Sequence, residues 1–266
     1  MFKTRLLSGI LLVIIALLTI ITGGDVLFGT ILLISLIGMT EIYKVLGIEK
    51  KELGIVGYIA ALAYFALIRF GLTEWVTALG ITFLILIMAV YVFTYPKFRS
   101  EHVTLAFFGL FYVAFMLSYV YQIRMLEQGA FLVWLVFLCS WGCDTSAYCV
   151  GVTMGKHKLA PVLSPKKSVE GAIGGVVGAA ILGALYATLL NRFAPGADAE
   201  VLQYALICGV GGIISQVGDL AASAIKRNHD IKDYGKLIPG HGGILDRFDS
   251  VIITAPIIYY MAIVLI

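Results

Sequence analysis

Three aspartates stand within or at the ends of long apolar runs, where an ionised side chain needs a particular reason to be present. Asp144 lies between Trp141 and Tyr148, Asp219 ends one apolar run, and Asp246 begins another. A charge at the centre of a membrane helix costs roughly 3 kcal/mol on insertion scales, so each acid is a functional hypothesis. Structural alternatives are an ion pair with a loop lysine, a hydrogen bond to a serine, and a helix cap, respectively.

Asp219 opens a polar helical face. Ser223 and Lys226 follow it at positions i+4 and i+7, so on a helix that continues past the membrane edge the three side chains share one face. Arg227 comes next. This face could bind phosphate groups. Alternatively, Asp219 and Lys226 could form an intrahelical ion pair on a solvated helix, and the segment alone favours neither interpretation.

A glycine-rich turn precedes Asp246. Pro239 is followed by Gly-His241-Gly-Gly, and Asp249 lies one turn beyond Asp246, with Arg247 between the two acids. Such a backbone allows close approach, and the amide groups at a helix start favour an anion. Paired carboxylates beside phosphates are typical of a Mg²⁺ site, since Mg²⁺ prefers oxygen ligands. The alternative is a plain turn capped by an aspartate.

A cationic loop precedes another predicted helix. It carries Ser164, Lys166, Lys167 and Ser168. Lysines and hydroxyls at a helix start suit phosphate binding. The lysines could instead only set the topology or touch anionic lipid headgroups.

The composition places these groups in a membrane protein. Of 266 residues, 61% are hydrophobic and 13% charged, and the mean hydropathy is +0.99. Soluble domains are about 45–50% apolar and about 25% charged. We therefore expect an all-α, polytopic integral membrane protein forming a single domain over residues 1–266, with N-terminal membrane helices in 1–130 and catalytic helices and cytoplasmic loops in 131–266.

Nine apolar runs are long enough to cross a bilayer, which takes roughly 20 residues in a helix. They cover residues 6–23, 26–46, 54–71, 76–95, 103–123, 130–150, 169–190, 201–221 and 250–266. In the seventh run, small residues at helical spacing predict close packing against another helix. They are Gly171, Gly174, Gly175 and Gly178.

The basic residues predict the orientation. With the N-terminus in the cytoplasm and the C-terminus outside, 16 of the 19 Lys and Arg residues fall on the cytoplasmic side. The exceptions are Arg69, Arg124 and Arg192. This asymmetry is what the positive-inside rule expects for nine spans.

The polar motifs resemble the signature of the phosphatidate cytidylyltransferases, also called CDP-diacylglycerol synthases. The resemblance covers residues 140–255 and runs through Asp144-Thr-Ser-Ala-Tyr148, Gly155-Lys-His-Lys158, Ser164-Pro-Lys-Lys167-Ser168 and the segment Ser223 to Asp249. It implies transfer of a cytidylyl group from CTP to phosphatidic acid, which gives CDP-diacylglycerol and pyrophosphate. The expected location is the inner (plasma) membrane, with the active site facing the cytoplasm.

With this resemblance, each polar residue takes an expected role. Asp219 and Asp246 are the expected Mg²⁺ ligands, with Asp144 and Asp249 beside them, and a second cation is left open. The groups expected to clamp or orient the phosphates are Lys167, Lys226, Arg227, Arg247, Ser223 and His241, with Ser164, Lys166 and Ser168 in the substrate-binding loop. Asp219, Asp246, Lys167, Ser223 and Lys226 form the expected catalytic set. The expected partners are CTP, phosphatidic acid and membrane lipid, without nucleic acid; a homodimer is left open.

Two other classes stay open. A cation-coupled transporter also carries intramembrane acids, although here the acids gather toward one membrane edge. A CTP-dependent membrane polyprenol kinase would use the same nucleotide. The Asp-Gly-x-x-Ala-Arg run of the CDP-alcohol phosphotransferases is missing from the chain.

Overall fold

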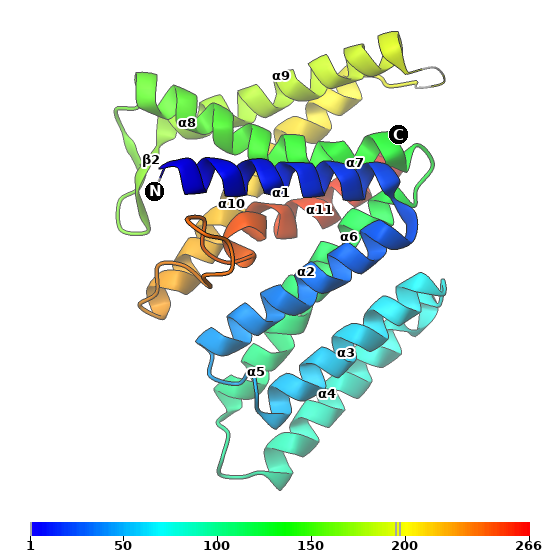
Figure 1. The fold of residues 1–266 in the computed structure, drawn as a ribbon, viewed down its shortest axis with the longest axis vertical. Coiled ribbons are helices and arrows are strands. Elements are labelled where there is room, and N and C mark those ends of the chain that lie inside the picture. Colours follow the sequence, from blue (N-terminus) through cyan, green and yellow to red (C-terminus); the bar gives the residue numbers. More distant parts are fainter. Residues whose placement is uncertain (1, 195, 197) are drawn as a thin grey trace. The chain divides into compact units, whose positions relative to one another are not determined.

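The computed structural model describes residues 2–194, 196 and 198–266, and most of this part of the chain is helical (Figure 1). The α-helices are α1 Phe2–Thr22, α2 Gly24–Val45, α3 Glu52–Arg69, α4 Val76–Phe93, α5 Ser100–Gly109, α6 Met116–Arg124, α7 Gly129–Phe137, α8 Cys143–Met154, α9 Val169–Phe193, α10 Val201–Asn228 and α11 Leu245–Leu265. A short 3₁₀ turn, η1 (Thr73–Trp75), leads into α4. Two strands, β1 Lys158–Ala160 and β2 Ser164–Ser168, form an antiparallel pair.

Two of the predicted spans are continuous helices with a π-helical segment inside. The segment η2 (Leu110–Phe115) joins α5 to α6, and η3 (Leu138–Gly142) joins α7 to α8. A π segment adds a residue to a turn and so shifts the register of the side chains that follow, often at functional sites. In the second case the shift falls directly before Asp144.

The helices confirm the all-α membrane fold. Among the described residues, eight helical stretches are long and apolar enough to cross a membrane, and Ser8–Thr22 is a shorter apolar helix at the place of the first predicted span. The division into N-terminal membrane helices (1–130) and a catalytic part (131–266) stays a prediction. Residues 1, 195 and 197 lie outside the described residues.

The chain forms two compact units. The first unit comprises Met1–Ser118 with Asp233–Arg247, and the second comprises Tyr119–Lys232 with Phe248–Ile266. In the first unit, the fully buried Tyr43 of α2 donates a hydrogen bond to the backbone oxygen of Ala106 on α5 (2.6 Å). A methyl group on Gly57 of α3 or on Gly109 of α5 would collide with the Tyr43 ring, so both helices pack directly on this side chain.

In the second unit, glycines bring α9 against α8, as the sequence predicted. A Cβ at Gly175 would lie 2.9 Å from the Ala147 Cβ and 3.0 Å from the Cys143 oxygen of α8. A Cβ at Gly174 would meet Val150 at 2.5 Å. The absence of side chains here lets the two backbones approach, as in small-residue helix pairs in membranes.

The segment after α8 differs from the predicted loop. The helix continues to Met154, and residues 158–168 then form the β1–β2 hairpin, with Lys158 opposite Ser168 and Ala160 opposite Ser164. Ser168 ends the hairpin and begins α9, because its Oγ accepts the Gly171 N–H at 3.1 Å as a helix cap. The hairpin therefore ties the lysines of β2 to a fixed helix start.

Candidate functional site

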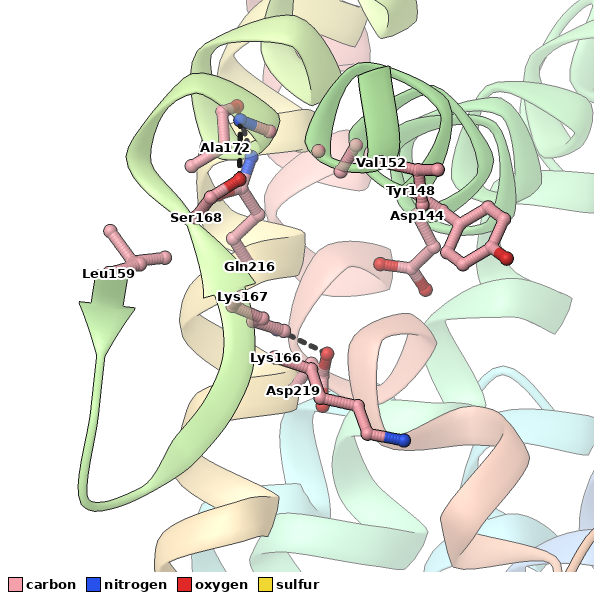
Figure 2. A pocket seen from close by; sticks show the side chains of 13 residues that line it. Asp144, Tyr148, Val152, Leu159, Lys166, Lys167, Ser168, Ala172, Gln216 and Asp219 are labelled. Atoms are coloured by element: carbon pink, nitrogen blue, oxygen red, sulfur yellow. Dashed lines mark hydrogen bonds and ion pairs between the residues drawn. The ribbon is translucent and has the colours of Figure 1, made fainter. Parts of the chain in front are cut away.

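A pocket of about 370 Å³ lies within the second unit, between α8, the hairpin, α9 and α10 (Figure 2). Its charged lining residues are Asp144 from α8, Lys166 and Lys167 from β2, and Asp219 from α10. The remaining lining residues include Tyr148, whose ring is exposed, and Gln216. With Ser168, which also lines the cavity, five predicted site residues therefore share it.

The strongest contact in the pocket is an ion pair between the Lys167 Nζ and Asp219 Oδ2. Both side chains are about three-quarters buried, at 26% and 25% exposure, so the pair is screened less than a surface pair would be. It fixes the hairpin against α10. Figure 2 shows the Asp144 carboxylate projecting from α8 toward the same open space. The pocket thus combines carboxylates with ammonium groups, as a site for metal-bound or free phosphates requires.

Asp249, on the part of α11 that belongs to the second unit, interacts electrostatically with Asp219, Lys226 and Asp144. Its backbone lies close to α10, since a Cβ at Gly218 would be 2.9 Å from the Asp249 oxygen. Three of the predicted acids therefore share one electrostatic environment. Within the described residues, no group of three or more His, Cys, Asp or Glu side chains is arranged to hold a metal ion.

The predicted polar face of α10 is helical throughout. The helix runs to Asn228, past the predicted span end at residue 221, so Asp219, Ser223 and Lys226 do lie on successive turns. Ser223 and Lys226 are half-buried and Arg227 is exposed. None of these three lines the pocket, and neither does Ser164, which is half-buried at the start of β2. Ser168 lines it while capping α9.

Asp246 is buried in the first unit, at 6% exposure. Its Oδ2 accepts the backbone N–H groups of Tyr234 (2.8 Å) and Gly243 (2.9 Å). Both donors belong to residues before Leu245, so these bonds anchor the loop that leads into α11. Gly242 has a φ of 89°, and a Cβ there would lie 2.7 Å from the Asp246 Oδ2. Glycine is needed at this position both for the left-handed backbone and for the approach of the carboxylate.

The rest of the glycine-rich loop is held by α1 and by Arg247. The Ser8 hydroxyl donates to the Pro239 oxygen (3.0 Å) and lies 2.8 Å from the His241 Nδ1. A hydroxyl has a single proton, so the imidazole is the donor in the second contact. The Arg247 Nε donates to the His241 oxygen (3.1 Å). His241 and Arg247 therefore lie together in the first unit.

Glu41 of α2 also binds this loop, and the sequence did not lead us to predict it. Its Oε1 accepts the Ile244 N–H and its Oε2 the Leu245 N–H, each at 2.9 Å. The expectation of free amides at this helix start is wrong for these two residues, because the chain's own carboxylate occupies them. The signal was available: Glu41 is an acid within the predicted span 26–46, and the cost of an intramembrane charge applies to it too.

Comparison with known proteins gives a match along nearly the whole chain. The model of the cytidylyltransferase family matches residues 3–265. The chain is 32% identical over 272 residues to the phosphatidate cytidylyltransferase of Bacillus subtilis, covering 97% of both chains. It is 33% identical over 269 residues to the enzyme of the same name from Staphylococcus aureus, covering 96% of this chain and 97% of the relative. The similarity thus includes the N-terminal helices, beyond the motifs in residues 140–255.

The geometry at Gly242 predicts a large effect of adding one methyl group. Gly242→Ala forces a left-handed φ on alanine, at about 1–2 kcal/mol, and drives the Cβ into Asp246, which adds roughly 1–3 kcal/mol of overpacking. Gly71→Ala is the matched control, because Gly71 has a φ of 71° with nothing within 4 Å of a Cβ. Thermal unfolding in detergent should show a clearly lower Tm for Gly242→Ala than for Gly71→Ala. Equal Tm values would contradict the close contact.

Proposed function

The chain belongs to the cytidylyltransferase family, and from this membership we propose that it transfers a cytidylyl group from CTP to phosphatidic acid. The products are CDP-diacylglycerol and pyrophosphate. The observation that carries the proposal is the match over residues 3–265, together with relatives named phosphatidate cytidylyltransferase that align over 97% of their length. The pocket supports it with lysines from the β1–β2 hairpin and carboxylates from two membrane helices.

The reaction asks the protein for positioning and charge neutralisation. A phosphate oxygen of phosphatidic acid forms a bond to the α-phosphorus of CTP. The bond from that phosphorus to the oxygen bridging the β-phosphorus breaks, and pyrophosphate leaves with the electron pair. The lipid phosphate is already ionised near neutral pH, so no strong general base is required. In this proposal Lys166 and Lys167, which line the pocket, neutralise phosphate oxygens as negative charge shifts toward the leaving group.

The carboxylates of the pocket fit a magnesium ion. Asp144 and Asp219 offer hard oxygen donors from two helices to one cavity, and Mg²⁺ is commonly bound by one or two carboxylates plus substrate phosphates. When bound, the ion would neutralise the triphosphate. We propose Asp249 of the second unit and Asp246 of the first unit as further metal ligands. Lys226, Arg227 and Arg247 are proposed to bind phosphates that Ser223 and His241 orient.

We further propose that the protein lies in the inner membrane with its N-terminus and its active site in the cytoplasm, where CTP is made. The 16 to 3 division of the basic residues supports this orientation. The hairpin, the end of α10 and the glycine-rich loop then all belong to cytoplasmic connections.

The reaction class is tested by incubating purified protein with Mg²⁺, labelled CTP and phosphatidic acid. We expect CDP-diacylglycerol and pyrophosphate in equal amounts, because one of each forms per transfer. Polyprenol replaces phosphatidic acid in the control. Release of CDP together with a phosphorylated alcohol would identify a kinase and overturn the proposal.

The orientation is tested with reporter fusions. A periplasm-active reporter fused after Ile266 should be active, and one fused at Lys232, between α10 and α11, should be silent, since the chain crosses the membrane once between them. A cytoplasm-active reporter should give the inverse pattern. A cytoplasmic C-terminus would exclude this orientation.

The metal proposal predicts the effect of neutralising the acids. Asp219→Asn and Asp246→Asn should each lower turnover by on the order of 10³, about 4 kcal/mol of transition-state stabilisation. Asp230→Asn should be near normal, because Asp230 is an exposed loop residue with a φ of 51°, which asparagine tolerates. Activity is normalised to the monodisperse fraction and measured across a Mg²⁺ titration. If either acid only caps a helix or forms an ion pair, its variant would give less folded protein but keep its turnover per folded molecule, and the metal proposal would be wrong for that acid.

A further inference from the structure

The start of α11 carries no capping side chain of its own. Gly242, Gly243 and Ile244 precede Leu245, and none of them has a polar side chain that could accept the unpaired N–H groups of a first helical turn. The amide of Leu245 and those of the two residues before it nevertheless have acceptors. Three successive amides, of Gly243, Ile244 and Leu245, all donate to carboxylates.

Two of the three amides are bound by Glu41, which lies 203 and 204 residues away in the sequence, on α2. The Glu41 side chain is buried, with the residue at 8% exposure. Each of its oxygens takes one of two neighbouring amides, at 2.9 Å in both cases. A single acceptor would be enough to cap a helix. A bidentate contact also fixes the direction in which the helix leaves the loop.

The loop is shaped to receive this carboxylate. A Cβ on Gly235 or on Gly243 would collide with the Glu41 Oε1, although neither glycine has a left-handed backbone. These two glycines therefore serve the approach of Glu41 to the backbone. The same loop also binds Asp246, whose Oδ2 accepts the amide of Gly243, so the two carboxylates bind neighbouring amides of one segment.

We propose that Glu41 is a positioning residue for the cytidylyl transfer reaction. From α2 it binds the first amide of α11, that of Leu245, and the amide of Ile244 directly before the helix, and thereby sets the place of Asp246 and Arg247, which follow within the same turn. This inference rests on the proposed function, in which Asp246 and Arg247 act on the metal and the phosphates. Glu41 itself touches backbone amides and does not need to meet a substrate.

The test compares Glu41→Gln with wild type and with Glu101→Gln, which neutralises an exposed acid of α5 in the same unit. Glutamine keeps one acceptor but turns an NH₂ group toward the second amide. We expect kcat per folded molecule to fall by about 10²-fold, the effect of a small misplacement of catalytic groups. KM for CTP and phosphatidic acid should stay near wild type, because the loss lies in the transition state.

Two further measurements separate positioning from stability. Glu41→Asp keeps the charge on a shorter side chain, and we expect its kcat to lie between those of wild type and Glu41→Gln. Hydrogen exchange should show faster exchange of the Ile244 and Leu245 amides in Glu41→Gln, with the Glu101→Gln control unchanged.

The proposal is overturned if Glu41→Gln has wild-type kcat per folded molecule, or if its activity loss only follows the loss of monodisperse protein. If neither Glu41 variant folds, Glu41 is a folding residue and the positioning role is likewise overturned. None of these results would touch the proposed reaction, which wild-type product formation tests separately. An absence of CDP-diacylglycerol from wild type would refute the reaction and leave the hydrogen exchange result standing.

Discussion

A charged side chain in an apolar helix bundle must find a partner or stay in water, and this constraint organises both units of the protein. An uncompensated buried charge costs several kcal/mol, a large part of the net stability of a folded chain. The structure meets the constraint in two ways. Lys167 and Asp219 neutralise one another across the pocket of the second unit. Glu41 and Asp246 are surrounded by backbone amides in the first unit.

These two solutions have different chemical consequences. An ion pair at the wall of a cavity can exchange partners, since a phosphate can take the lysine and a cation can take the carboxylate. A carboxylate held by backbone amides has partners that cannot leave without unfolding the loop. The first arrangement therefore suits substrate binding. The second holds carboxylate and loop in fixed positions, which the proposed roles of Glu41 in positioning and of Asp246 in metal binding both require.

The sequence predicts the membrane helices well, because the bilayer thickness sets the length of apolar runs. It predicts helix ends less well. Hydropathy measures contact with lipid, whereas α8 and α10 continue as helices into polar sequence as far as Met154 and Asn228. The β1–β2 hairpin was missed because Lys158–Ala160 and Ser164–Ser168 are short and show no apolar alternation. Asp144, Lys167 and Asp219 were found because an intramembrane acid and a basic loop are visible in composition. The partners of Glu41 could not be predicted, because they are backbone amides, which nearly every residue has.

The glycine-rich segment shows why motif chemistry needs geometry. From the sequence, glycines before a helix start predict close approach of a phosphate. In the structure, Gly235, Gly242 and Gly243 admit the carboxylates of Glu41 and Asp246 instead. Both interpretations rest on the same physics, because a helix N-terminus favours any anion within reach. The amides of this loop already bind carboxylates of the chain itself, so the proposed function leaves substrate phosphates to side chains such as Lys166 and Lys167.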